Sequence, residues 1–342
     1  MAVMNGPIVV WGAGAIGGTL AAYWKRAGVE VLLVDIDSAH VEACRTQGLQ
    51  ITGPVESFSV VIPAVTPDEL EGTYDRIVLA VKAQHTPEAI TALAPHLAAD
   101  GFVLSAQNGL NETEIARRLG SERTMGCFVN FSADWHGPGE VMFGSRGAVV
   151  VGELDGVDRT RTHEMFELLT VFEPDAVLSD NIWGYLWGKL AYGAMLFATA
   201  LNMDSMTENF DDPNRFPVWR ALGAEVMEAT EANDVEAIGF NGYDPASFRR
   251  QASDDDARRS VAQLADFNRH SAKTHSGIWR DLAVRQRKTE IDMQIAIISE
   301  LAASKGVATP TIDKLVELIH DIEEGRRAQS MDTFAELLAI CG

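Results

Sequence analysis

A glycine-rich segment near the N-terminus has the residue types and the spacing of a phosphate-binding loop. It runs Gly12-Ala13-Gly14-Ala15-Ile16-Gly17, so its three glycines follow the pattern GxGxxG. In such a loop the first glycine permits a tight turn, the second lets backbone approach a pyrophosphate, and the third lets helix pack on strand. The free amides and the dipole at the helix N-terminus favour the negative phosphates. The segment predicts a dinucleotide site; a glycine turn that binds nothing is the alternative.

The carboxylate of Asp35 is placed to select the dinucleotide. Asp35 comes 23 residues after Gly12, at the end of the next apolar run, where its carboxylate can accept hydrogen bonds from both ribose hydroxyls. Asp35, together with Asp37, would repel a 2′-phosphate, and no arginine stands at positions 36–38 to bind one. These residues favour NAD over NADP as the cofactor.

The elements that must hold this loop follow the alternation of a buried parallel sheet. The run Ile8–Trp11 predicts a first strand, and a helix to Ala27 is expected to end at Gly28, before a second strand over Val29–Val34. Continuous apolar strands joined by helices are typical of a parallel sheet that is covered on both faces. Further strands are expected over Arg76–Val81, Gly101–Ser105, Ala148–Gly152 and Ala176–Leu178, with a helix from Pro87 to about Leu97.

The pattern changes after Asp180. The remaining sequence has almost no strand signal and long helical stretches, with caps expected at Asp244 before Pro245 and at Thr309 before Pro310. We therefore predict an α/β domain over residues 1–180 and an all-α domain over residues 181–342.

Composition excludes several classes of function. The chain has 342 residues, with 28 basic and 49 acidic side chains and a net charge of −21, which argues against binding to nucleic acid or to anionic lipid. No apolar run approaches the roughly 18 residues of a membrane span, and the first predicted strand leaves no room for a signal peptide. We expect a cytoplasmic protein.

No metal site or disulfide framework is expected. Cys44, Cys127 and Cys341 are odd in number and far apart, and the eight histidines form no HxxxH or HxxH pair. The acidic run 254–256 is interpreted as a solvated loop or a helix start, because no second acidic cluster is spaced to complete a cation site.

Five motifs, in this order and spacing, give the chain a resemblance to a known family. They are the glycine segment, Val81-Lys82-Ala83, Gln107-Asn108-Gly109, Trp187-Gly188-Lys189-Leu190, and Arg287-Lys288-Thr289-Glu290-Ile291-Asp292. Over nearly its whole length the chain resembles the ketopantoate reductases and related 2-hydroxyacid dehydrogenases. The resemblance implies a doubly wound Rossmann domain, a C-terminal helical domain, and an active site in the cleft between them.

The resemblance also implies roles for single residues. Lys189 matches the family's proton donor to the substrate oxygen, and Glu290 matches a glutamate that helps to hold substrate and cofactor. Residues matching Lys82, Asn108 and, more loosely, Ser132 line the family's cofactor cleft.

The chemistry of these residues suits reduction of a 2-oxo acid. When hydride reaches C2, negative charge builds on the oxygen, and a positioned ammonium can stabilise that charge and supply a proton. Partial burial or charged neighbours would lower the pKa of a lysine toward this task. Asn108 follows the predicted strand Gly101–Ser105, at the carboxyl ends where open α/β sheets bind ligands, so its amide could bridge nicotinamide and substrate.

Structural explanations exist for the same residues. Lys189 could be an ordinary surface lysine, Asn108 a turn residue before Gly109, and Glu290 a surface partner of Arg287 on the same helix face. Trp183, Trp187, Leu190 and Ala194 form a stripe at helical spacing that predicts core packing.

The substrate side departs from the family pattern. The lysine helix of the family usually carries asparagines four and eight residues after the lysine, where this chain has Gly193 and Phe197. These positions share one helix face with Lys189, so the surface facing the substrate is expected to be less polar than in a ketopantoate reductase. Each lost buried amide forfeits roughly 1–3 kcal/mol of hydrogen bonding.

A second departure precedes Glu290. The family usually has Ser-Ser-Met before an acidic residue, and this chain has His275-Ser276-Gly277-Ile278, with the second serine lost. Ser276 is a candidate substrate ligand beside Gly277. Lys273 or His275 could replace a carboxylate anchor, although a loop cation facing water is the simpler interpretation.

The sequence therefore predicts an NAD(P)-dependent oxidoreductase that transfers hydride between nicotinamide and C2 of a small 2-oxo or 2-hydroxy acid. An authentic 2-dehydropantoate 2-reductase of pantothenate biosynthesis and a non-catalytic dinucleotide sensor are the alternatives. The apolar C-terminal helix over Phe334–Ile340 could pair two chains into a homodimer.

Overall fold

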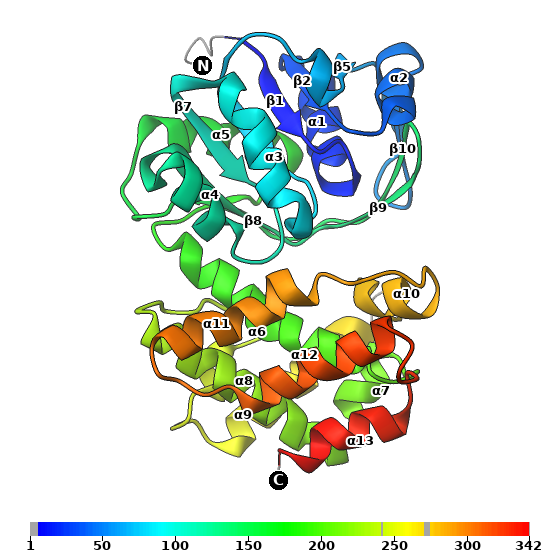
Figure 1. The fold of residues 1–342 in the computed structure, drawn as a ribbon, viewed down its shortest axis with the longest axis vertical. Coiled ribbons are helices and arrows are strands. Elements are labelled where there is room, and N and C mark those ends of the chain that lie inside the picture. The colour runs from blue at the N-terminus through cyan, green and yellow to red at the C-terminus, as the bar shows by residue number, and fades with distance from the viewer. Residues whose placement is uncertain (1–5, 241, 270–273, 342) are drawn as a thin grey trace. The chain divides into compact units, whose positions relative to one another are not determined.

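The computed structural model describes residues 6–240, 242–269 and 274–341, which form two compact units (Figure 1). The first unit extends to Ile182 and the second begins at Trp183. The first is an α/β unit and the second is helical, which confirms the predicted fold class.

An eight-stranded sheet forms the centre of the first unit. Its order is β12-β11-β8-β7-β6-β1-β2-β5. The strands are β1 (Ile8–Trp11), β2 (Val31–Val34), β5 (Ala64–Val65), β6 (Tyr74–Leu79), β7 (Leu97–Ser105), β8 (Thr124–Val129), β11 (Val149–Glu153) and β12 (Val177–Leu178). All pairs are parallel except β8–β11, so the predicted parallel sheet is mixed at this one position. Only strands connect β8 to β11, and the chain needs a crossover connection, usually a helix, to return in the parallel direction.

Both faces of this sheet are buried, as a doubly wound sheet requires. Along β1, Ile8 and Val10 belong to one apolar cluster while Val9 and Trp11 belong to another. Helices α1 (Ala15–Arg26) and α5 (Thr160–Phe172) cover the first face, and α3 (Thr86–Leu93) and α4 (Asn111–Leu119) cover the second. Helix α3 ends earlier than predicted because Pro95 cannot continue a helix, and Leu97 already belongs to β7.

A second, four-stranded sheet was not predicted. Its order is β4-β3-β10-β9, with β4 at Phe58–Val60, β3 at Leu49–Thr52, β10 at Glu140–Ser145 and β9 at Ser132–Gly137. β3 and β10 are parallel, and β9 and β10 form an antiparallel hairpin. Val141 and Phe143 of β10 join the apolar cluster that also buries α1, so this sheet packs beside the glycine segment's own helix.

The second unit is built from helices. They are α6 (Ile182–Thr199, which starts at the last residue of the first unit), α7 (Met206–Asp211), α8 (Phe216–Ala232), α9 (Asp254–Arg269), α10 (Gly277–Ala283), α11 (Ile297–Ser304), α12 (Pro310–Glu323) and α13 (Met331–Ala339). A π-helical segment, η7 (Asp292–Ala296), precedes α11. The acidic run 254–256 forms the first turn of α9.

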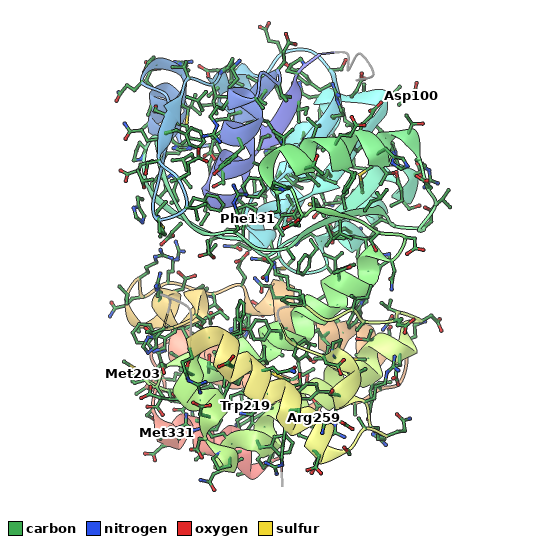
Figure 2. The ribbon with its side chains drawn as sticks, turned by 180° about the vertical axis from the view of Figure 1, so that it is seen from behind. Asp100, Phe131, Met203, Trp219, Arg259 and Met331 are labelled. Carbon is green, nitrogen blue, oxygen red and sulfur yellow. The ribbon has the colours of Figure 1, made fainter. Side chains whose placement is uncertain are left out.

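The C-terminal helix uses its apolar side chains inside the chain. Phe334 and Leu337 are fully buried, and the ring of Phe334 packs against Trp219 of α8 at 5.8 Å between centroids. Trp219 and Met331, the first residue of α13, are labelled in Figure 2. Met331 and Ile340 remain exposed. A homodimer through this helix would therefore have to form without its two largest buried side chains, Phe334 and Leu337. No helix in the described part of the chain is long and apolar enough to cross a bilayer.

The buried thiol of Cys44 is expected to be chemically inert. Burial, with a smaller contribution from the Asp35 charge, raises the pKa of Cys44 to about 12, so very little thiolate exists at pH 8. Alkylation of Cys44 by iodoacetamide should be more than about 100-fold slower in the native protein than in urea, as mass spectrometry would measure. Rapid native modification would contradict this packing.

Candidate active site

The glycine segment has the tight geometry that its glycines predict. Gly12 has a φ of +99°, and a Cβ there would lie 2.7 Å from the Val81 nitrogen. A Cβ on Gly17 would lie 2.0 Å from the carbonyl oxygen of Gly12, so the third glycine is required for the turn to close on α1. Neither position tolerates a side chain without moving backbone.

The same segment is open on the side where a phosphate would approach. A Cβ on Gly14 would meet nothing within 4 Å. Gly14 is the N-cap of α1, no side chain caps the helix, and its first turn, which contains Ala15 and Ile16, carries no acidic residue. An open glycine before an uncapped, uncharged helix start fits a dinucleotide pyrophosphate.

Asp35 lies at the carboxyl end of β2 and is tied to the glycine segment. Its Oδ2 accepts a hydrogen bond from the Ala13 amide at 2.7 Å, and its Oδ1 accepts one from the Asp37 amide at 3.0 Å. Each carboxylate oxygen can accept a second bond, so these contacts fix the carboxylate and leave capacity for ribose hydroxyls. Ile36 beside it is 81% exposed.

The remaining predicted cofactor residues lie at the same edge of the main sheet. Because β1, β2, β6, β7 and β8 are parallel, their carboxyl ends meet there. Lys82 is exposed and follows β6, and half-buried Asn108 follows β7. Ser132 stands just beyond β8, where it begins β9 of the second sheet. The sequence prediction thus names residues that the topology gathers at one edge.

Gln107 holds the loops after β6 and β7 together, a role that sequence reasoning did not assign. Its side chain is 4% exposed, and Nε2 donates to the Val81 carbonyl and to the Thr86 hydroxyl, both at 2.8 Å. Thr86 donates to Asn111, whose Nδ2 donates to the Asn108 carbonyl at 2.6 Å. This network fixes the backbone of Asn108.

In the second unit, α6 carries Lys189, Gly193 and Phe197. Lys189 and Gly193 are half-buried and Phe197 is 1% exposed. The nearest atom to a Cβ built on Gly193 is Ile295 Cδ1 at 4.0 Å, which places α6 against the π-helical segment η7 that follows Glu290. Helix α6, which carries Lys189, is therefore a neighbour of η7, which begins two residues after Glu290. Of the predicted core stripe, Trp187, Leu190 and Ala194 are buried and Trp183 is half-buried.

Glu290 stands immediately before a helix rather than within one. Residues 286–289 are not helical, Gln286 has a φ of +47°, and the Arg287 guanidinium donates to Asp281 at 2.9 Å. The premise that Arg287 and Glu290 share a helix face was therefore wrong. Thr289 donates to the buried carboxylate of Glu323 through both its amide, at 2.7 Å, and its hydroxyl, at 2.6 Å, which anchors the segment before Glu290.

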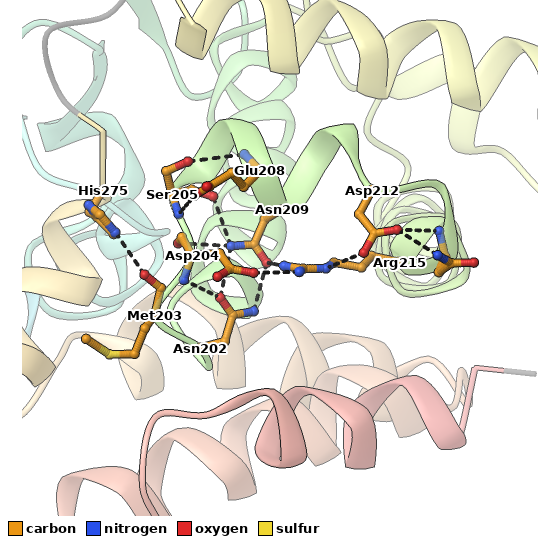
Figure 3. A network of polar contacts seen from close by, with 10 residues as sticks. Asn202, Met203, Asp204, Ser205, Glu208, Asn209, Asp212, Arg215 and His275 are labelled. Carbon is orange, nitrogen blue, oxygen red and sulfur yellow. Dashed lines mark hydrogen bonds and ion pairs between the residues drawn. The ribbon is translucent and has the colours of Figure 1, made fainter.

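The segment His275–Gly277 docks on the turn between α6 and α7 (Figure 3). Nε2 of His275 lies 3.2 Å from the Met203 carbonyl, and the imidazole stacks on Trp279 at 4.1 Å between centroids. Ser276 is 3% exposed and caps α10, accepting a hydrogen bond from the Trp279 amide, and Gly277 is the first residue of that helix. Lys273 lies outside the described residues. The imidazole of His275 thus already contacts two residues of the second unit, Met203 and Trp279.

Among the described residues, no group of three or more histidine, cysteine or carboxylate side chains is arranged to hold a metal ion. The open glycine turn, the Asp35 carboxylate beside it and the edge where the parallel strands end are the features of a Rossmann-like dinucleotide-binding module.

Two family models match the chain. The first, ketopantoate reductase PanE/ApbA, matches residues 8–156, and the second, its C-terminal domain, matches residues 181–323. The chain belongs to the ketopantoate reductase family of NAD(P)-dependent oxidoreductases.

Relatives in sequence and structure cover almost all of both chains. A 2-dehydropantoate 2-reductase of Streptococcus pyogenes is 23% identical over 316 residues, 92% of this chain and 96% of that protein. One from Mesorhizobium japonicum is 26% identical over 348 residues, 94% and 99% of the two chains. D-Mandelate dehydrogenase in complex with NADH and anilino(oxo)acetate superposes with a TM-score of 0.79 at 23% identity, covering 93% of this chain and 99% of that one. A 17% identical ketopantoate reductase of Staphylococcus aureus, with a TM-score of 0.68 and coverage of 94% and 100%, is described as dimeric.

Proposed function

We propose that this protein is an NAD-dependent dehydrogenase that interconverts a 2-hydroxy acid bearing an apolar substituent and its 2-oxo acid. The observation that carries the proposal is the α6 face that starts at Lys189. One turn after the lysine, Gly193 carries no side chain, and a Cβ there would be in van der Waals contact with Ile295 Cδ1 at 4.0 Å. Phe197, two turns after the lysine, is 1% exposed, so neither position places an amide on this face. Such a face supplies no amide to a polar substituent of the acid, which favours an apolar one.

The roles of the residues follow from charge development at the substrate oxygen. When bound, the nicotinamide supplies or accepts the hydride at C2. Lys189 Nζ donates a proton to the substrate oxygen during reduction and accepts one during oxidation, and its charge stabilises the developing alkoxide. Glu290 and Asn108 orient the acid and the cofactor. Ser276 and His275 are candidates to hold the substrate carboxylate.

The choice of NAD rests on the first unit. The carboxylate of Asp35, fixed by the Ala13 and Asp37 amides, would accept the ribose hydroxyls and repel a 2′-phosphate. The residues of the glycine segment would hold the pyrophosphate, with Lys82 and Ser132 beside it. The NADH bound to D-mandelate dehydrogenase, and the phenyl ring of its anilino(oxo)acetate ligand, agree with this choice of cofactor and of an apolar acid.

A substrate and cofactor panel tests the proposal. Initial rates are compared for ketopantoate, pyruvate, branched 2-oxo acids and phenylglyoxylate with NADH and with NADPH, and for the corresponding hydroxy acids with the oxidised cofactors. We expect kcat/KM to be at least about tenfold higher with an apolar acid and NADH than with ketopantoate and NADPH, a difference of about 1.4 kcal/mol.

The variant Gly193→Asn sharpens this comparison. Asparagine would add bulk and an amide to the α6 face one turn after Lys189, so kcat/KM for phenylglyoxylate should fall more than that for pyruvate. Exclusive turnover of ketopantoate with NADPH would instead identify an authentic 2-dehydropantoate 2-reductase, the activity named for the Streptococcus and Mesorhizobium relatives. Dinucleotide binding without turnover of any acid would indicate a sensor.

A further inference from the structure

A buried histidine, His40, contacts the backbone of the glycine segment, a contact that the sequence did not predict. His40 lies on α2 (Ser38–Thr46), which begins directly after Asp35 and Asp37, and is 1% exposed. Its Nε2 lies 2.8 Å from the carbonyl oxygen of Ala13. Ala13 is the residue between the first two glycines of the loop, so the imidazole reaches the backbone whose shape a pyrophosphate would recognise.

The other ring nitrogen joins His40 to the second sheet. The amide of Gly139, in the turn between β9 and β10, donates to Nδ1 at 2.9 Å, and the Trp135 indole nitrogen lies 3.4 Å from the same atom. A Cβ on Gly139 would lie 2.8 Å from the Ala43 Cβ, so only glycine lets the turn approach α2 this closely.

These partners determine the tautomer of the imidazole. Nδ1 accepts the Gly139 N–H and therefore carries no proton, so the ring proton is on Nε2 and is donated to the Ala13 carbonyl. The imidazole therefore accepts a hydrogen bond from the turn between β9 and β10 and donates one to the glycine segment.

Ala13 is consequently held on both sides of its backbone. Its amide donates to Asp35 and its carbonyl accepts from His40. Each bond is shielded from solvent to some degree, and the His40 bond is fully buried. Fixing both groups of one residue between two glycines removes freedom that the loop would otherwise lose on binding a ligand.

We infer that His40 is a positioning residue for the dinucleotide, which ties the glycine loop to the β9–β10 turn and sets its shape before the cofactor arrives. His40 does not touch the cofactor; it acts through Ala13. The inference rests on the proposed dinucleotide-dependent function, and it concerns affinity for the cofactor rather than the chemical step.

Three substitutions separate the two bonds. His40→Gln can place an amide nitrogen near the position of Nε2 and keep the donor to Ala13. His40→Asn can place an oxygen near Nδ1 and keep only the acceptor for Gly139. His40→Leu removes both and fills much of the same volume.

The readout is the Kd for NADH from protein fluorescence quenching, together with Tm and with kcat at saturating cofactor. We expect His40→Leu and His40→Asn to raise Kd about tenfold, which corresponds to about 1.4 kcal/mol for the lost hydrogen bond to Ala13. His40→Gln should stay within about threefold of the wild type, and kcat should change less than about twofold, because the lost bond affects affinity only. Half-buried His96, which directly precedes β7 and whose Nδ1 lies 3.0 Å from the Gly72 carbonyl oxygen, serves as the matched control when substituted to glutamine. If the wild type prefers NADPH, the same series is measured with NADPH.

Equal Kd values for the wild type and the asparagine variant would overturn the inference. So would losses of affinity that follow Tm across all three variants regardless of which bond is kept, because they would indicate packing alone. Should the leucine variant not fold, the glutamine–asparagine pair decides. A wild type that binds dinucleotide with the expected order of variants but turns over no acid would refute the proposed function and leave the role of His40 standing.

Discussion

Replacing Lys189 by alanine is expected to lower kcat at least about 100-fold in both directions, because a positioned general acid contributes roughly 10²–10⁴ to the rate. The helix that carries Lys189 is anchored by the buried side chains of Trp187 and Leu190, so truncating a half-buried lysine should leave the fold intact. Steady-state kinetics on the best acid of the panel, with circular dichroism and NADH affinity measured in parallel, provides the check.

Two companion variants make the result specific to the ammonium. Lys189→Arg keeps a positive charge but cannot give up a proton readily, so it should recover binding of the acid more than kcat. Lys305→Ala removes an exposed lysine beyond α11 and should behave as the wild type. A near-normal rate for Lys189→Ala would remove this residue from the mechanism.

Replacing Asp35 should invert the preference for the dinucleotide. Loss of the carboxylate removes two acceptors for ribose hydroxyls, each worth about 1.5–3 kcal/mol for a charged partner, so kcat/KM for NADH should fall at least about 100-fold in Asp35→Ala. The value for NADPH should rise, because the repulsion of the 2′-phosphate is gone.

Asp35→Asn is the matched variant for this effect. It keeps an acceptor for the Ala13 amide and removes only the charge, so the glycine segment should stay in place while the NADPH/NADH ratio of kcat/KM increases. An unchanged ratio in both variants would show that the cofactor is selected elsewhere.

The parts of the fold that the sequence predicted are those fixed by local constraints. The segment from β1 to β2 was predicted because its turn is determined within the motif, where a Cβ on Gly17 would collide with the Gly12 carbonyl oxygen. The antiparallel direction of β11 was not predicted, because a buried strand has the same apolar pattern whether it runs parallel or antiparallel to its neighbour. The second sheet was missed because β3, β4 and β9 are short and partly exposed, and β3 pairs with β10 across a long stretch of sequence.

The residues of the candidate site also fall into two groups, those that a motif predicted and those that it did not. Motifs predicted the candidate ligand-binding and catalytic residues, such as Asp35, Asn108 and Lys189. They gave no sign of His40, Gln107 or the Glu323 anchor of Thr289, because these side chains bind backbone groups distant in sequence. A polar residue in a helix or loop looks the same before folding whether water or a buried carbonyl becomes its partner.

The tie between His40 and Gly139 spans 99 residues of chain. During synthesis the glycine motif is complete long before the β9–β10 turn is made. The nascent N-terminus therefore contains every residue of the motif but lacks the Gly139 amide that binds His40. Contacts of such long range are made late, after the entropy of closing the intervening loop has been overcome. We therefore expect the first unit to reach its full affinity for a dinucleotide only after the β9–β10 turn has packed against α2.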